Sequence, residues 1–129
     1  MARVLVVDDE QAIRESMDLI LGDHGHEVRT ASDGREALAQ LRGWSPEIIV
    51  TDWMMPHMGG EQLLGRLPSV PGCRGTPVIV MSALSLTARP SVTAFLRKPF
   101  SAGLLLELIA RHTGVPARRT HAGTAVAAR

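Results

Sequence analysis

Short, wholly apolar runs separated by helix-like segments constrain the fold of this chain more than any other feature. Residues 4–7 (Val-Leu-Val-Val), 48–50 (Ile-Ile-Val) and 78–81 (Val-Ile-Val-Met) are apolar at every position. A strand is apolar throughout when both of its faces are buried, as in a parallel sheet covered by helices. Two more strands are expected: a polar one at 26–31, near a sheet edge, and a very short one at 94–96.

Segments with helical spacing lie between these runs. In the first of them Ile13, Met17, Ile20 and Leu21 recur every three or four residues, and Gly22 is a plausible stop. Helices are expected at residues 11–21, 33–41 (capped by Ser32 or Asp33), 60–67 and 101–111. The alternation predicts an α/β domain with a doubly wound, five-stranded parallel sheet and helices on both faces. Residues 114–129 have no apolar pattern and are expected to form a flexible tail or linker.

Composition excludes several classes of function. The chain has 129 residues, 45% apolar and 21% charged, which suits a globular domain with an aliphatic core. A net charge of +1 and only 3% aromatic residues argue against direct nucleic-acid binding. No apolar run approaches the roughly 20 residues of a membrane span, and the run at 4–7 is too short for a signal peptide. With Cys73 as its single cysteine, the chain is expected to be cytoplasmic and not membrane-associated.

Polar residues follow four of the five expected strands, at the end where ligands bind in open parallel sheets. They are Asp8-Asp9-Glu10 after the first strand, Asp52 after the third, Ser82 after the fourth and Lys98 after the fifth. Clustered carboxylates repel one another unless a cation lies among them, and hard oxygen ligands suit Mg²⁺. A carboxylate beside Mg²⁺, a hydroxyl and an ammonium can attack a phosphoryl group. The sequence therefore predicts a site that accepts a phosphoryl group.

Each of these residues also has an ordinary structural interpretation. Asp8-Asp9-Glu10 could cap the following helix or complement its dipole, and Asp52 could be an N-cap. Ser82 could be a turn residue, and Lys98 a solvated charge. Four coincidences at four strand ends are much less frequent than any one of them.

These residues carry a family likeness: the sequence resembles the receiver domain of bacterial two-component response regulators, over about residues 3–112. The motifs that carry the resemblance are Val-Leu-Val-Val-Asp8-Asp9-Glu10, Asp52-Trp-Met-Met-Pro56-His-Met-Gly-Gly60, Val-Ile-Val-Met-Ser82-Ala83 and Lys98-Pro99-Phe100. The resemblance implies a flavodoxin-like, CheY-like fold and a receiver domain over residues 1–113. It also implies a switch in phosphorelay signalling that catalyses only its own phosphorylation and dephosphorylation, and is not a turnover enzyme.

The resemblance also implies a role for each site residue. Asp52 would be the phosphoacceptor, taking phosphate from the phosphohistidine of a sensor histidine kinase or phosphotransfer protein. Asp52 and Asp9 would bind Mg²⁺ directly and Asp8 mainly through water, with the main-chain carbonyl of Met54 as a further ligand. Ser82 and Lys98 would bind the phosphoryl oxygens, and Ser82 with Phe95 would form the switch that signals to a downstream protein. The Lys98–Pro99 peptide bond would be cis.

Two departures from the family pattern stand out. Only 15 residues separate Ser82 from Lys98, about six fewer than the family pattern, and Pro90 lies among them. The fourth helix is therefore expected to be shortened or missing, which alters the usual signalling and dimer face. Met54 and Leu84, two residues after Asp52 and Ser82, are both apolar and cannot orient an attacking water. We expect slow self-dephosphorylation.

Two other functions remain open at this stage. One is a Mg²⁺-dependent phosphohydrolase similar to the haloacid dehalogenases, with Asp8 as nucleophile and Glu10 as acid; in it Asp52 would have no role. The other is a degenerate receiver that only binds partners, against which the full set of acids, Ser82 and Lys98 argues. The length leaves no room for an output domain, so output would come through protein contacts, unless the chain is part of a longer regulator.

Overall fold

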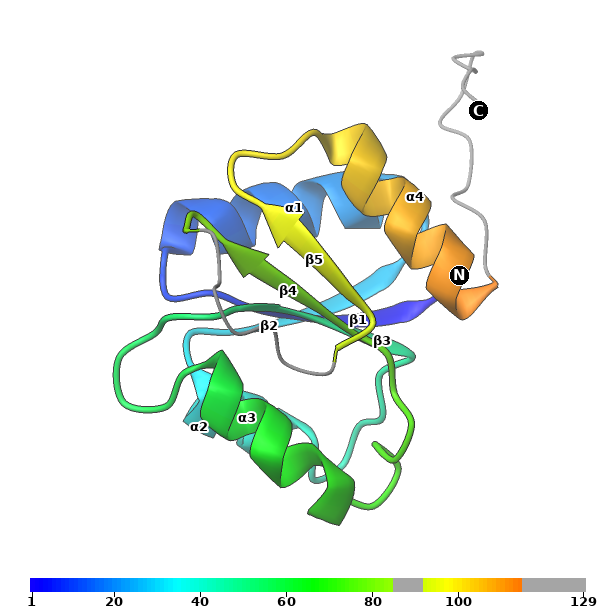
Figure 1. The fold of residues 1–129 in the computed structure, drawn as a ribbon. Coiled ribbons are helices and arrows are strands. Elements are labelled where there is room, and N and C mark those ends of the chain that lie inside the picture. Colours follow the sequence, from blue (N-terminus) through cyan, green and yellow to red (C-terminus); the bar gives the residue numbers. More distant parts are fainter. Residues whose placement is uncertain (85–91, 115–129) are drawn as a thin grey trace.

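The computed structural model describes residues 1–84 and 92–114, and its centre is a parallel sheet with the strand order β2-β1-β3-β4-β5 (Figure 1). The strands are β1 (Arg3–Val7), β2 (Glu27–Ala31), β3 (Ile48–Asp52), β4 (Val78–Ser82) and β5 (Ala94–Arg97). All five lie where the sequence predicted strands, and the more polar β2 is an edge strand as expected. The prediction of a doubly wound, five-stranded parallel sheet is confirmed.

Helices cover both faces of the sheet, which explains why the central strands are apolar at every position (Figure 1). Side chains alternate between the faces of a strand. Val4 and Val6 of β1 belong to the core cluster that includes residues of α1 (Gln11–Asp23) and α4 (Ala102–Thr113). Leu5 and Val7 belong to the cluster on the other face, with residues of α2 (Gly34–Gln40) and α3 (Gly60–Arg66). As the composition predicted, both clusters are largely aliphatic.

Helix boundaries follow local capping chemistry, with one clear difference from the prediction. Helix α1 does not stop at Gly22 but continues to Asp23. The residue that takes the left-handed conformation is Gly25, at φ 89°, so the chain reverses three residues later than expected. At α2 the N-cap is Asp33, whose carboxylate accepts a hydrogen bond from the Glu36 N–H at 3.0 Å.

The described residues contain four α-helices, α1 to α4, and a short 3₁₀ helix at Leu67–Ser69. The expected shortening of the helix between β4 and β5 concerns residues 83–93, and 85–91 lie outside the described residues. That expectation is therefore not tested. Among residues 1–84 and 92–114, no helix is long and apolar enough to cross a membrane.

The topology brings the ends of β1 and β3 together. These strands are neighbours although a helix, a strand and a second helix separate them in sequence. In their register Val7 lies opposite Thr51, so the residues that follow, Asp8 and Asp52, emerge side by side. Chain connections leave β1 and β3 in opposite directions along the sheet, and such switch points are where open α/β sheets bind ligands.

Candidate phosphoryl-accepting site

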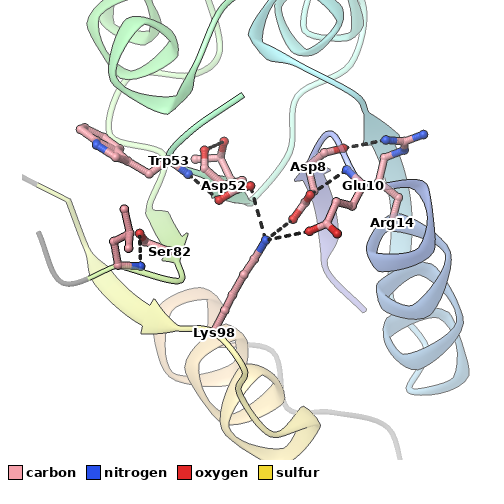
Figure 2. A network of polar contacts seen from close by, with 9 residues as sticks. Asp8, Glu10, Arg14, Asp52, Trp53, Ser82 and Lys98 are labelled. Atoms are coloured by element: carbon pink, nitrogen blue, oxygen red, sulfur yellow. Dashed lines mark hydrogen bonds and ion pairs between the residues drawn. The ribbon is translucent and has the colours of Figure 1, made fainter. Parts of the chain in front are cut away.

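The carboxyl ends of β1, β3 and β5 bring three acidic side chains and one ammonium together (Figure 2). The Lys98 Nζ lies 2.8 Å from Asp8 Oδ2 and 3.4 Å from Asp52 Oδ2. Lys98 is therefore not the solvated charge of the ordinary interpretation: only 15% of its side chain is exposed. The exposed carboxylate of Glu10 is a more distant partner, at 3.9 Å.

Asp8 is fully buried, and both oxygens of its carboxylate are engaged. Oδ1 accepts a hydrogen bond from the Glu10 N–H at 2.9 Å, and Oδ2 accepts one from Lys98. Neither Asp8 nor Glu10 caps α1 in the way the ordinary interpretation supposed: Glu10 is the N-cap residue, but its side chain makes no capping hydrogen bond. The position of Asp8 is thus set by the β1–α1 loop and by Lys98.

Asp52 is the last residue of β3 and is 9% exposed. Its Oδ1 accepts a hydrogen bond from the Trp53 N–H at 2.9 Å, which fixes the orientation of the carboxylate. It is not a helix cap, because α3 begins at Gly60 with Gly59 as its N-cap. The loop between Asp52 and α3 turns back on itself, because the Gly60 N–H donates a hydrogen bond to the Trp53 carbonyl oxygen at 2.9 Å.

The electrostatics of the site follow from burial and from the close charges. Burial raises the pKa of Asp52, and the negative charge of Asp8 adds to this, while the Lys98 ammonium acts in the opposite direction. Burial alone would lower the pKa of Lys98, but the hydrogen bond and charge of Asp8, together with Asp52, outweigh it and raise that pKa. Lys98 therefore stays protonated and holds the two carboxylates together.

Asp8, Asp9 and Asp52 each place one carboxylate oxygen within 4.8 Å of the other two. Three oxygens at this spacing can share one hard divalent cation that keeps part of its water shell. The donor set therefore fits Mg²⁺, and no nitrogen or sulfur ligand is among the three. Exposure differs between them: Asp9 lies open to solvent while Asp8 is buried.

Ser82 and Phe95 have contacts other than those of the acidic cluster. Ser82 ends β4 and is nearly buried, and its Oγ accepts a hydrogen bond from the Leu84 N–H at 3.1 Å (Figure 2). This is the turn contact that the ordinary interpretation proposed. Phe95 is half-buried and packs on the core cluster beside α2 and α3. The Lys98–Pro99 peptide bond is cis, as the resemblance implied.

Glu10, one of the acids that the sequence placed at the end of the first strand, approaches the Lys98 ammonium. One contact carried no signal in the sequence: the Arg14 Nη1 donates a hydrogen bond to the main-chain carbonyl of Asp8 at 2.7 Å. A charged residue in the first turns of a helix is too common to indicate such a contact. Met54 and Leu84, by contrast, are 66% and 63% exposed beside the site, as their positions suggested.

Comparisons with known proteins agree on one family. Residues 4–110 match the model of the response regulator receiver domain. Response regulator MprA of Mycolicibacterium vanbaalenii is 37% identical, over 92% of this chain and 52% of its own length. The chain thus spans about half of that relative. Protein PilG of Pseudomonas aeruginosa is 35% identical, over 85% of this chain and 86% of its own length.

Solved structures give the same picture. The Vibrio cholerae chemotaxis protein CheY4 superposes with a TM-score of 0.82 at 33% identity, covering 87% of this chain and 98% of its own. The receiver domain of the Francisella response regulator 1452 superposes with a TM-score of 0.79 at 32% identity, covering 88% and 98%.

Proposed function

The chain belongs to the response regulator receiver domain family of two-component systems, and from this premise we propose that Asp52 accepts a phosphoryl group in a Mg²⁺-dependent reaction. The observation that carries the proposal is the position of the Asp52 carboxylate. It lies in a cluster with Asp8 and Asp9, and 3.4 Å from an ammonium that stays protonated. A nucleophile, ligands for a cation and a counter-charge for phosphoryl oxygens thus meet at one point.

The transfer is a substitution at phosphorus. A carboxylate oxygen of Asp52 attacks the phosphorus atom while the bond to the leaving group breaks: P–N for the phosphohistidine of a sensor kinase or phosphotransfer protein, P–O for acetyl phosphate. The products are an aspartyl phosphate and free histidine or acetate. The hydrogen bond from the Trp53 N–H to Oδ1 leaves Oδ2 as the oxygen that faces Lys98.

The proposed ligands of Mg²⁺ are Asp52 and Asp9 directly, Asp8 mainly through water, and the main-chain carbonyl of Met54. When bound, the cation supplies positive charge that offsets the charge on the phosphoryl oxygens. Lys98 holds its place between Asp8 and Asp52 and then pairs with the phosphoryl group. These roles rest on the donor set and on the family.

Switching would start from the new negative charge on Asp52. A phosphoryl group adds up to two charges and three acceptor oxygens in a site that is nearly buried. The Ser82 hydroxyl would leave the Leu84 N–H and bond a phosphoryl oxygen, and Phe95 would move inward into the space this opens. The changed surface would then control a downstream protein partner. Residues 1–113 are the proposed receiver domain.

Of the two other functions, the phosphohydrolase is disfavoured because it gives Asp52 no role. Asp52 nevertheless lies in one cluster with Asp8 and Asp9 and pairs with Lys98. A degenerate receiver would have lost one of the acidic or basic groups, whereas Asp52, Asp8 and Lys98 form one connected network.

The test is phosphorylation by a small donor. The protein is incubated with Mg²⁺ and acetyl phosphate and analysed by intact mass. We expect one acid-labile phosphoryl group on the wild type and on the control variant Asp18→Ala, whose aspartate is exposed on α1, and none on Asp52→Ala. Unmodified wild type, or phosphorylation that survives Asp52→Ala, would contradict the proposal.

A further inference from the structure

Both the main chain and the carboxylate of Asp8 are hydrogen-bonded. One of its partners is a side chain of α1 that no pattern in the sequence indicated. The main-chain N–H of Asp8 donates to the Ala31 carbonyl at 3.1 Å, and its carboxylate contacts the Glu10 N–H and Lys98. Its main-chain carbonyl accepts the 2.7 Å hydrogen bond from Arg14 (Figure 2). That short charge-assisted bond ties the β1–α1 loop to the helix that follows it.

Arg14 is itself well placed for this contact. It lies one turn into α1, and its main-chain N–H donates to the Glu10 carbonyl at 3.1 Å. The side chain is half-buried against the loop. The helix and the guanidinium therefore hold residues 8–10 between them, and these residues include two of the three acids of the cluster.

We propose that Arg14 is a positioning residue for the cation site: it fixes the loop that presents Asp8 and Asp9 to Mg²⁺. The inference rests on the proposed function, because it assumes that the acidic cluster binds Mg²⁺. Arg14 contacts a main-chain carbonyl and does not touch the ligand oxygens themselves. It belongs to the outer contacts of the site, whose removal typically weakens metal binding about 10–100-fold.

Positioning and charge predict opposite effects for Arg14, which makes the proposal testable. If the guanidinium acted only through its charge, removing it would strengthen Mg²⁺ binding, because one repelling cation would be gone. If it acts by holding the loop, removing it weakens binding. Its half-exposed charge is screened by solvent, whereas the hydrogen bond to Asp8 is short, so the positioning effect is the larger one.

The experiment is a Mg²⁺ titration of the unphosphorylated protein, followed by NMR. The amide signals of Glu10 and Trp53 report on the site, since these N–H groups donate to Asp8 and Asp52. Wild type, Arg14→Met, Arg14→Lys and the control Arg111→Met are compared. Arg111 is exposed on α4, and among the described residues its one ion pair is with Glu107. Thermal unfolding without metal shows that each variant is folded.

We expect Arg14→Met to bind Mg²⁺ about tenfold more weakly than wild type. Arg14→Lys, which keeps a charged donor, should recover most of the affinity, and Arg111→Met should bind like wild type. A purely structural role would lower the melting temperature but leave the Kd of the folded protein unchanged. An unchanged or tighter Kd for Arg14→Met overturns the inference alone, whereas absence of Mg²⁺ binding by the wild type overturns the proposed function as well.

Discussion

Lys98 is the single lysine among 14 basic side chains, and its surroundings explain why arginine would not replace it. Its compact ammonium fits between Asp8 and Asp52, at 2.8 and 3.4 Å, with most of the side chain buried. A guanidinium is planar and larger, so it cannot approach both carboxylates in the same way. Elsewhere on the surface either residue serves, and the chain uses arginine.

Lys98→Arg should therefore impair switching although the charge is kept. The measurement is the shift of the Phe95 and Ser82 amide signals on addition of Mg²⁺ and acetyl phosphate. We expect this shift to be about tenfold smaller in Lys98→Arg than in wild type. Outright removal of such a donor typically costs more, roughly 10²–10³-fold. A conservative change at an exposed site, Arg111→Lys, serves as the control. A full response in Lys98→Arg would show that charge alone is sufficient.

Met54 is 66% exposed beside Asp52 and has no group that can hold a water for attack on phosphorus. Met54→Asn should shorten the lifetime of the aspartyl phosphate, on the order of tenfold, since an amide can orient that water. The lifetime is measured by intact mass after the phosphodonor is removed. Leu19→Asn makes the same kind of change on the exposed face of α1, where Leu19 is 74% exposed, and should leave it as in wild type. An unchanged lifetime in Met54→Asn would refute this account.

His26 is a buried imidazole with a role in stability rather than in phosphoryl transfer. Its Nδ1 accepts a hydrogen bond from the Ala2 N–H, so the ring must be neutral, and Nε2 has no hydrogen-bond partner among the described residues. Burial, the N-terminal charge and His24 lower its pKa below the ordinary 6.5, with Glu47 opposing them. The unfolded chain then takes up this proton at a higher pH than the folded one.

This His26 contribution to stability is complete above pH 6.5 and is lost as the pH falls towards the folded-state pKa. His26→Asn offers an amide oxygen to the Ala2 N–H and does not titrate. We expect the free energy of unfolding of this variant, measured in urea, to fall less than that of wild type between pH 7 and about pH 5. His112→Asn, on α4, should follow wild type. Parallel pH profiles for wild type and His26→Asn would exclude the effect.

At the scale of elements, the loop between β3 and α3 depends on a close approach that only glycine permits. A Cβ on Gly60 would lie 2.6 Å from the main-chain oxygen of Asp52 and 3.1 Å from the Cα of Trp53. These are backbone atoms, which cannot turn aside as a flexible side chain can. The start of α3 therefore packs directly against the main chain of Asp52.

Gly60→Ala should destabilise the protein by about 1–3 kcal/mol, as overpacking against a fixed backbone does. Gly65, on the same helix, has nothing within 4 Å of its Cβ position, and Gly65→Ala should stabilise by about 0.5–1 kcal/mol. Urea unfolding measures both. Equal effects of the two substitutions would mean that helix propensity alone governs these positions.

The elements themselves were predictable because their signals are local. Apolar runs located the three central strands, the alternation with helices located the other two, and Asp33 was among the two candidate caps of its helix. The end of α1 was wrong because Gly22 and Gly25 are equally plausible stops in sequence, and the left-handed turn formed at the second. The contact of Arg14 was missed because it depends on how a helix packs against a loop.

At the scale of the whole molecule, the sheet brings together groups that are distant in sequence. Asp8 and Lys98 are 90 residues apart and share a 2.8 Å hydrogen bond. Chain order predicted that they meet, because parallel strands end at one edge. It did not predict which carboxylate Lys98 would prefer, and it left open whether Ser82 would be a turn residue, as its bond from the Leu84 N–H makes it here, since these are choices among close alternatives in the folded site.

A cluster of three carboxylates with one ammonium stabilises the folded state less than a neutral site would, because like charges repel within 4.8 Å. Function and stability are therefore opposed at this edge of the sheet. Asp9 is the most exposed of the three, so its replacement disturbs packing least. Asp9→Asn should raise the melting temperature of the metal-free protein by about 2–4 °C, while removing one proposed ligand.

With Mg²⁺ the order of the two melting temperatures should reverse, so that wild type becomes more stable than Asp9→Asn. A ligand that binds only the folded state stabilises it by about 1.4 kcal/mol at ten times its Kd. Wild type should gain this stability in Mg²⁺ and Asp9→Asn should lose most of the gain, in thermal unfolding with and without the metal. Asp18→Asn, on the exposed side of α1, controls for the loss of one surface charge. An equal gain in stability for wild type and Asp9→Asn would exclude Asp9 as a ligand of the cation, because a true ligand links Mg²⁺ binding to folding.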